Sequence, residues 1–314
     1  MNLLVGALSM GLLLSLLALG VFVAFRILGT YDLTADGAFG VGAVVAAALL
    51  ARGFDPTTAS VVAGLAGGAA GAVTSLLHTR LKVDILLAGI LVTTALYSLD
   101  LFLMKGGDIP LAGTHALPAT AERIWLAAGL SERGVELFGT RVSARSLATL
   151  IALIPAAGVP VFLLDRFFRT SLGLALRAIG DNRTMARAVG IDVDAMFVLG
   201  IVAANGMVGL SGALFAQYQS FANIQMSFGN LVTGLGCVIL GDAIARGRSL
   251  EGRILGVVLG TILFRLLVAG AITAGVAPNA LKLLTALFVL AVLVIPDIVR
   301  ARFPHRMAGA PARG

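Results

Sequence analysis

The stretch Arg169–Asp194, RTSLGLALRAIGDNRTMARAVGIDVD, is polar but patterned, and long apolar runs lie on both sides of it. Its apolar residues, such as Leu172, Leu176 and Ile179, recur at roughly helical spacing. Its many charged residues prevent it from spanning a membrane. The stretch therefore predicts a short helix–turn–helix between two membrane spans, lying on the cytoplasmic face and docking onto a partner protein.

Composition places the chain among the polytopic membrane proteins. Of its 314 residues, 59% are hydrophobic and 12% are charged, and the mean hydropathy is +1.00. A soluble domain has about 25% charged residues, and apolar runs of about 20 residues are long enough to cross a bilayer. The net charge of +7 therefore indicates Lys and Arg on cytoplasmic loops and not nucleic-acid binding.

The apolar runs predict an all-α polytopic membrane protein with about eight or nine transmembrane helices in a single domain, residues 1–314. The second run is short and follows a polar turn, which is typical of a discontinuous helix. The predicted spans are Leu3–Phe25, Phe39–Ala51, Thr57–Leu77, Ile85–Met104, Ser146–Leu164 with Pro155 and Pro160 kinking or dividing it, Ala195–Tyr218, Gly229–Ala245, Ile254–Thr273 and Leu281–Ile295.

Positive charge orients the chain, because cytoplasmic loops carry excess Lys and Arg. The basic regions fall on one side when the nine predicted spans alternate, which puts the N-terminus outside and the C-terminus in the cytoplasm of a bacterial inner membrane. The orientation of the N-terminus depends on the second span crossing fully. The loop Lys105–Arg145 has balanced charges and is assigned outside, with a surface helix at Ala121–Leu130 carrying Trp125. The basic regions are His78–Lys82, Arg169–Asp194, Arg246–Arg248 and the tail from Arg300.

Glycine spacing predicts close helix packing within the membrane. The third span carries overlapping GxxxG spacings, and the eighth has glycines at i, i+4 and i+8 on one face. Small residues at such spacings let helix backbones approach closely. The glycines assigned to packing are Gly64, Gly68, Gly252, Gly256 and Gly260.

Polar side chains inside the spans are candidates for a translocation path, because a charge at membrane depth is costly. Arg265 in the eighth span can meet an anionic carboxylate, and pairing with an acidic neighbour such as Asp100, or reaching out to the interface, explains it equally well. Tyr97 lies beside Asp100 in the fourth span. Asn205, central in the sixth span, either lines the path or bonds across helices.

A further polar group, Asp32, Thr34 and Asp36, precedes the second span. Capping of that helix by Asp36 or Thr34 accounts for one of these residues. A role in a cytoplasmic gate is the more specific hypothesis for the group.

Several chemical motifs are absent from the sequence. It has no GxxxxGK[ST] phosphate loop, so the chain is not expected to hydrolyse ATP itself. Its histidines lie outside the spans and far apart, and its single cysteine, Cys237, lies in an apolar run. We therefore expect no catalytic residues, no metal site and no cofactor in this chain, and an intramembrane enzyme is disfavoured.

The segment Thr170–Ala178, TSLGLALRA, followed by Gly190-Ile191, resembles the coupling loop of ABC-importer permeases of the branched-chain amino-acid (LIV) type, which reads TSLGRALRA and then LGI. Ile27–Ala43 resembles the early motif of that superfamily, with DLTADG in place of an LNLAHG-like turn. The DLTxDG form and Leu86–Ser98 are similar to the branch with tryptophan/tyrosine-type or uncharacterised substrates. Gly236–Gly260 resembles the glycine-rich loop between late spans. The resemblance covers most of Arg26–Val299 and is weakest in Lys105–Arg145.

The resemblance implies that Arg169–Asp194 sits in a groove of a separate ABC ATPase dimer, which binds ATP and Mg. It also implies an extracytoplasmic substrate-binding protein, docking on Lys105–Arg145 and Gln219–Phe228. An ATPase dimer has two grooves and this chain has one coupling segment, so a second permease copy, most simply in a homodimer surrounded by lipid, is expected. Ser171 is expected to cap the first helix of this segment. The residues expected to couple to the ATPase are Ser171, Gly173, Arg177, Gly180, Asp181, Asn182, Arg187 and Gly190.

Alternatives stay open at this point. An ordinary positive-inside loop also explains the charges of Arg169–Asp194. A stand-alone secondary transporter or channel for a small polar solute needs coupling-ion carboxylates, for which Asp36 and Asp100 are thin support. The branch resemblance implies a small amino acid, with an aromatic one favoured, while nucleosides and other small carboxylates remain possible substrates.

Overall fold

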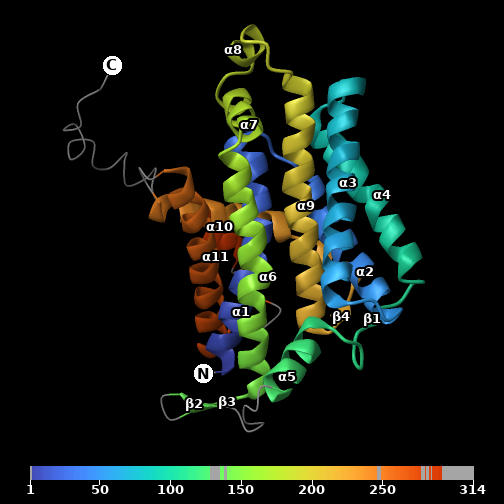
Figure 1. The fold of residues 1–314 in the computed structure, drawn as a ribbon, viewed down its shortest axis with the longest axis vertical. Helices are drawn as coiled ribbons and strands as arrows, with labels where there is room; N and C mark the ends of the chain where they lie inside the picture. Colours follow the sequence, from blue (N-terminus) through green and yellow to red (C-terminus); the bar gives the residue numbers. More distant parts are fainter. Residues whose placement is uncertain are drawn as a thin grey trace, which may run out of the picture.

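The fold is a bundle of long helices lying roughly along one axis (Figure 1). The structure is a computed structural model that describes residues 2–127, 135–137, 140–245, 249–276, 280, 283 and 285–291. Within these ranges, eight helices are long and apolar enough to cross a membrane. The all-α polytopic architecture expected from the sequence is therefore confirmed.

The helices follow the predicted spans closely at most boundaries. The long helices are α1 (Asn2–Phe22), α2 (Thr34–Ala51), α3 (Pro56–Leu81), α4 (Ile85–Leu103), α6 (Ala144–Phe168), α9 (Val193–Gln219), α10 (Asn230–Ile244) and α11 (Leu250–Thr273). The short elements are η1 (Val23–Ile27), β1 (Ile109–Pro110), α5 (Leu117–Ala127), β2 (Val135–Leu137), β3 (Thr140–Val142), α7 (Ser171–Asp181), α8 (Arg183–Ala188), β4 (Phe221–Ala222) and η2 (Ile224–Ser227).

Helix α1 is the centre of the bundle. It is apolar on every side and packs against α6, α9, α10 and α11, as expected for a helix without a polar face. Leu13, Leu16 and Phe22 are fully buried. At its end the chain forms a π-helix, η1. Such short π-helical turns often occur at functional sites.

The second span is one uninterrupted helix, α2, which is long and apolar enough to cross a membrane and is longer than the short, discontinuous helix expected from the sequence. After η1, residues 28–33 are not helical, and α2 begins only at Thr34. The expectation that Asp36 or Thr34 caps this helix is wrong. The N-cap position is Leu33, which offers no capping side chain, and Asp32 Oδ1 in the preceding turn accepts from the Thr34 backbone N–H at 2.9 Å.

Helices α2, α3 and α9 form the most closely packed group. A Cβ at Gly64 would lie 2.7 Å from Leu210 Cγ, and one at Gly68 would lie 3.4 Å from the Val202 carbonyl oxygen, both on α9. Gly256 and Gly260 make similar approaches to Gly241 on α10. Gly252 lies in the first turn of α11. Small residues thus line the closest helix contacts.

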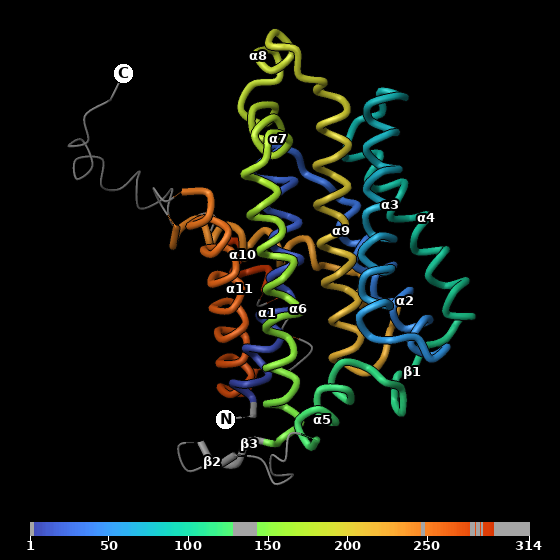
Figure 2. The backbone as a smooth tube through the Cα atoms, in the orientation of Figure 1, coloured from blue at the N-terminus to red at the C-terminus, as the bar shows by residue number. Residues whose placement is uncertain are grey.

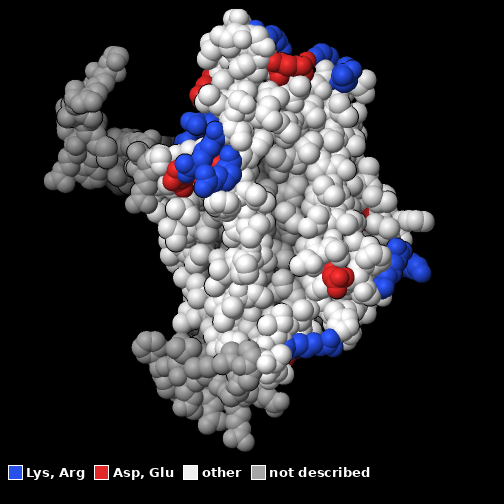
Figure 3. All heavy atoms as spheres, viewed as in Figure 1, with Lys and Arg blue, Asp and Glu red and all other residues white. Residues whose placement is uncertain are grey.

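Helix α6 is continuous from Ala144 to Phe168, although it contains Pro155 and Pro160. The expectation that these prolines divide the span is therefore wrong. Along α6, α3 and α9 runs an apolar groove of 620 Å³. The surface in Figure 3 carries its charged side chains toward the two ends and is largely uncharged between them, as a lipid-facing belt requires.

The two ends of the bundle have different structures (Figures 1 and 2). Helices α7 and α8 lie at one end, and α5, the strands and the start of α1 lie at the other. Strand β1 pairs antiparallel with β4, and β2 with β3. Residues 281, 282, 284 and 292–295 of the predicted ninth span lie outside the described residues, as do residues 246–248 and the basic tail.

Candidate functional site

Helices α7 and α8 form the helix–turn–helix predicted from the opening stretch. Thr170, not Ser171 as expected, caps α7, because Thr170 Oγ1 accepts from the Gly173 backbone N–H at 3.3 Å. Asn182 separates the two helices and caps α8 through its Oδ1, which accepts from the Met185 N–H at 2.9 Å. Gly190 follows α8 with a φ of 85°, a left-handed conformation that suits glycine.

One face of α7 is buried in the main core, and the rest of the pair is exposed. Leu176 and Ile179 are buried. In contrast, Leu174, Met185 and Val189 are 63%, 48% and 67% exposed. Arg177, Asp181 and Arg187 are exposed around them. Apolar side chains surrounded by charge are typical of a protein-docking surface.

Ion pairs hold the junction between α6 and α7. Arg169 contacts Asp165 at 2.9 Å and also contacts Glu251 at the start of α11. A Cβ at Gly173 would collide with the Phe167 carbonyl oxygen and the Phe168 backbone. Gly173 therefore permits the tight turn between α6 and α7 and is not part of the exposed surface.

Helix α7 touches the bundle at the π-helix. A Cβ at Gly180 would collide with the Ile27 carbonyl oxygen, the last residue of η1. Leu176 of α7 and Leu28 both approach Gly200 of α9, at 3.0 and 2.8 Å from where its Cβ would lie. The polar helical pair is thus packed directly on the segment that leads to the DLTADG turn.

Asp32 is the centre of that turn. It is 3% exposed, and its Oδ2 accepts from Asn205 Nδ2 at 2.6 Å. Asn205 is itself 1% exposed and also donates to the Ile201 carbonyl. A buried carboxylate is tolerated only when its oxygens are bonded, and here the Thr34 N–H and Asn205 supply those bonds. Asn205 thus bonds from α9 to the turn, and it also lines the small cavity beside that turn.

Neighbouring helices hold the rest of the turn. Thr34 Oγ1 lies 2.7 Å from Thr74 Oγ1 on α3, and both are fully buried. Thr93 Oγ1 on α4 donates to the Leu33 carbonyl at 3.0 Å. Neither Thr74 nor Thr93 was singled out from the sequence, because a threonine in an apolar span ordinarily bonds its own helix.

Asp36 connects this turn to a second helix start. Its carboxylate accepts from the backbone N–H groups of Leu231 at 2.8 Å and Gly229 at 3.3 Å. These groups begin α10 and have no partner within that helix. The N-termini of α2 and α10 therefore meet at Asp36, whose negative charge suits two positive helix ends.

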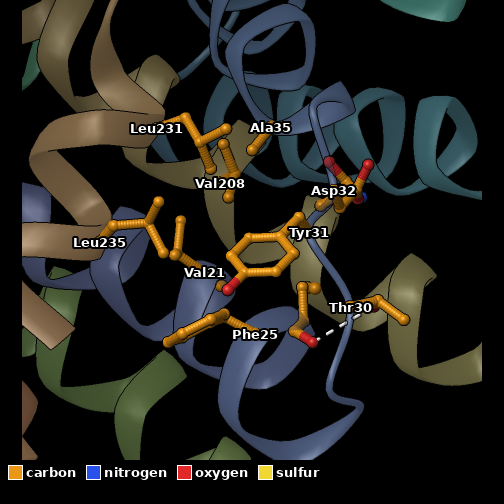
Figure 4. A pocket seen from close by; sticks show the side chains of 13 residues that line it. Val21, Phe25, Thr30, Tyr31, Asp32, Ala35, Val208, Leu231 and Leu235 are labelled. Carbon is orange, nitrogen blue, oxygen red and sulfur yellow. Dashed lines mark hydrogen bonds between the residues drawn. The ribbon is translucent and has the colours of Figure 1, made fainter. Parts of the chain in front are cut away.

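A small cavity lies beside the turn (Figure 4). Its volume is 10 Å³, room for about one water molecule. Figure 4 shows the Tyr31 ring among Phe25, Val21 and Leu235, while Asp32 points away from that ring. Thr30 Oγ1 donates to the Ala24 carbonyl at 3.3 Å. A cavity of this size has no room for a solute larger than water.

A larger polar cavity lies on the other side of Asp36. It measures 230 Å³ and brings together Asp36, Tyr97 and Asp100 from the sequence prediction. Phe228 faces Tyr97, with ring centroids 6.1 Å apart. Asp100 is 1% exposed. The cavity is lined by Asp36, Gly37, Thr93, Thr94, Tyr97, Asp100, Ser227 and Phe228.

Arg265 lies away from these residues, on α11 facing Cys237 of α10. The suggested pairing of Arg265 with Asp100 is wrong. Within the described residues, Arg265 Nε and Asp100 Oδ1 are both buried without a hydrogen-bond partner. We find no group of three or more His, Cys, Asp or Glu side chains there that suits a metal ion.

An ion-pair network beside η1 was also missed from the sequence. Asp242 on α10 contacts Arg26 at 2.8 Å and Arg253 on α11 at 3.4 Å. The Arg253 guanidinium also lies over the Phe22 ring, 5.4 Å from its centroid. The network ties η1 to α10 and α11. Arg26 is far in sequence from Asp242 and Arg253, so no local pattern indicates the network.

The chain matches known transport proteins over most of its length. Residues 3–295 match the family described as "Branched-chain amino acid transport system / permease component". The chain is 32% identical to the tyrosine transport system permease protein of Clostridioides difficile, over 94% of this chain and 91% of that protein. It is 29% identical to an Escherichia coli autoinducer 2 import system permease protein, over 79% and 65% of the two chains. No solved structure is a significant match.

Proposed function

The chain belongs to the family of permease components of branched-chain amino acid transport systems, and we propose that it imports a small amino acid with energy from a separate ATPase. The family comprises the membrane-spanning transport subunits of ABC transporters. One observation supports the proposal that a separate ATPase drives import. A polar helical pair at one end of the bundle packs directly on the segment leading to the buried DLTADG turn.

The exposed surface of α7 and α8 is proposed to bind the ATPase. Leu174, Met185 and Val189 expose apolar area at an end of the bundle, beyond the region that lipid covers. A cytoplasmic subunit that buries these side chains and pairs with Arg177 and Asp181 gains both apolar contact and charge complementarity. ATP and Mg act in that partner subunit.

The contacts also suggest how movement reaches the gate. Gly180 lies against Ile27, residues 28–33 follow directly, and Asp32 and Asp36 then bind Asn205 and the start of α10. Each step is a contact between packed groups. A displacement of α7 by the ATPase is therefore expected to move the turn and part the two helix N-termini that it joins.

The opposite end is proposed to receive solute from a binding protein. Strand β1 belongs to the loop Lys105–Arg145, and β4 lies at the start of the turn Gln219–Phe228. Their pairing joins the two regions expected to dock that protein. Asn223 Nδ2 adds a second link by donating to the Asp108 carboxylate at 2.8 Å.

The proposed orientation of the bundle in the membrane rests on its charges, and the proposed homodimer rests on symmetry. Arg80, Lys82 and Arg187 lie near the end that carries α7 and α8, so that end is proposed to face the cytoplasm of a bacterial inner membrane. Lys82 and Arg187 both approach Asp194, at 4.0 and 3.8 Å. One coupling segment per chain supports a homodimer on a two-grooved ATPase dimer.

The proposed solute is an amino acid with an aromatic side chain. The support is the similarity to the tyrosine permease, which extends over nearly the whole of both chains. The similarity to a Lactococcus lactis nucleoside permease covers only 47% of this chain. Tyrosine is therefore the first solute to test.

The test is uptake of labelled tyrosine by proteoliposomes containing the permease, its ATPase and its binding protein. We expect uptake to require ATP and to be lost in Arg177→Glu and Asp181→Arg, while both variants remain folded. Arg80→Glu, an exposed charge at the same end but outside α7 and α8, is the matched control and retains uptake. Uptake driven by an ion gradient without ATP, or normal uptake by both α7 variants, would contradict the proposal.

A further inference from the structure

The polar cavity between α2, α4 and η2 contains buried groups whose hydrogen-bonding capacity is unused. Asp100 is 1% exposed and Ser227 is 7% exposed, and both line the cavity. In the described part of the chain, Asp100 Oδ1 and Ser227 Oγ have no hydrogen-bond partner. Buried polar atoms are rarely left unpaired, so the two atoms indicate a missing ligand.

The cavity is also lined by acidic side chains and by no basic ones among the described residues. Asp36 and Asp100 are both among its lining residues, and the described residues that line it include no Lys, Arg or His. The charge of Asp36 is partly balanced, because its oxygens accept from the start of α10. Asp100 has no such donors. The local chemistry therefore favours a cation placed next to Asp100.

Gly40 shows that the two unpaired groups face the same point. A Cβ at Gly40 would collide with Ser227 Oγ and would lie 2.9 Å from Asp100 Oδ2. The absence of a side chain on α2 thus allows α4 and η2 to bring a carboxylate and a hydroxyl together. This arrangement is specific to glycine at that position.

The geometry points to the ligand class. We propose that this cavity binds the protonated primary amino group of the transported solute, with Asp100 as counter-ion and Ser227 Oγ as a hydrogen-bond acceptor. An ammonium group has three donors and no acceptor, which suits the carboxylate and the hydroxyl. The volume of 230 Å³ is many times the 10 Å³ of the cavity beside Tyr31, so the amino group enters with part of the carbon skeleton that carries it.

The aromatic pair extends the site toward that skeleton. Tyr97 and Phe228 line the same cavity, and their rings are tilted by 53°. Aromatic faces attract both cations and other rings. A solute with an ammonium group and an aromatic ring therefore matches both parts of the lining.

The position of the cavity agrees with this role. Asp100 is close to the end of α4, at Leu103, which leads to β1 and the end of the bundle proposed to receive solute. Asp36, in the first turn of α2, lines the same cavity. This inference rests on the proposed import of an amino acid, and it assigns the residues that hold the amino group before the turn opens.

The experiment measures the melting temperature of the purified, full-length permease with phenethylammonium chloride as the probe. Sodium chloride and potassium chloride at equal ionic strength test for an alkali-cation site, and sodium phenylpropionate tests for ring binding alone. We expect phenethylammonium to raise the melting temperature and the other salts to leave it unchanged. An equal rise with Na⁺, K⁺ or phenylpropionate, or no rise with the amine, would overturn the proposal.

Two variants make the test specific. Asp100→Asn keeps the shape but removes the charge, and we expect a loss of apparent amine affinity of roughly tenfold or more, since a charge-assisted bond is about twice as strong as a neutral one. Its melting temperature without ligand should not fall, because an unpaired buried carboxylate is removed. Ser98→Ala, an exposed position on the same helix, is the matched control and binds normally. Equal amine binding by Asp100→Asn and wild type would overturn the proposal.

Uptake separates this inference from the proposed function. If wild-type proteoliposomes show no ATP-dependent uptake, the proposed function fails regardless of amine binding. If wild type transports tyrosine and Asp100→Asn transports it equally well at low concentration, the amino-group site fails while the transport function stands.

Discussion

The contact between Gly180 and Ile27 is the first step of the proposed coupling route from α7 to the turn at Asp32. The addition of a single carbon atom at Gly180 perturbs this step. Replacing Gly180 with Ala adds a methyl group that collides with a backbone carbonyl oxygen. A flexible side chain can turn aside, but a carbonyl within η1 cannot, so α7 must move away from the π-helix. The change acts at the step where the polar helical pair meets the segment leading to Asp32.

The expected magnitude follows from two opposing effects. Alanine favours a helix interior over glycine by about 1 kcal/mol, and overpacking costs about 1–3 kcal/mol. The net loss at the contact is therefore up to about 2 kcal/mol. A loss of one or two kcal/mol changes a two-state population by a factor of roughly 5–30. We expect the tyrosine taken up per ATP hydrolysed to fall by a factor in that range.

The assay records uptake and ATP hydrolysis in the same proteoliposomes. Gly158→Ala on α6 is the matched control, because a Cβ at Gly158 meets nothing within 4 Å. We expect Gly180→Ala to keep hydrolysing ATP while losing uptake, and Gly158→Ala to behave as wild type. The reasoning is refuted if Gly180→Ala keeps the wild-type ratio, or if both variants lose it equally.

Other predictions test the local structure. Asn205→Ala leaves Asp32 Oδ2 without its donor, and we expect a destabilisation of about 1–3 kcal/mol, visible as a lower melting temperature; no change would mean that water replaces the amide. Asn182→Ala removes the cap of α8 and should cost about 1 kcal/mol, detected as faster amide hydrogen exchange confined to α8. Asp36→Ala frees the N–H groups of Leu231 and Gly229, and faster exchange at the start of α10 is expected; unchanged exchange would show that the carboxylate does not hold that helix.

The sequence predicted the fold largely through the length of its apolar runs. Runs such as Thr57–Leu77 and Ala195–Tyr218 lie within α3 and α9, because a span must satisfy its backbone hydrogen bonds internally and a helix is the simplest way to do so. The polar break between the first two spans was also visible in the sequence, but its length was not, because Thr34 and Asp36 belong to the first turn of α2.

The site was predicted only in part. The sequence pointed to Tyr97 and Asp100 as polar residues within an apolar run, and to Asp36 as part of the polar group before the second span. The structure brings all three to one cavity. Ser227 was missed because it lies in a polar turn, where a serine attracts no attention. The wrong pairing of Arg265 with Asp100 had a related cause. Partners between spans depend on how helices are arranged, and hydrophobicity along one chain does not contain that arrangement.

The capping residues were displaced by short distances for a physical reason. Thr170 caps α7 where Ser171 was expected, and the first N–H of α2 is bonded by Asp32 in the preceding turn and not by Asp36 or Thr34. Adjacent residues with similar side chains offer equivalent caps in sequence, and tertiary contacts choose among them. Asp36 illustrates this, because its carboxylate is engaged by α10.

The central claim, that α7 and α8 bind the ATPase, is tested most directly by site-specific cross-linking. Cys237 is the single cysteine and is buried, so Cys237→Ala provides a background in which one cysteine at a time carries a photoreactive label. With the label at Val189, 67% exposed on the polar pair, we predict a covalent product with the ATPase subunit. With the label at Phe102, 80% exposed on α4, we predict none. Cross-linking at Phe102 but not at Val189, in a complex that imports tyrosine with ATP, would contradict the account.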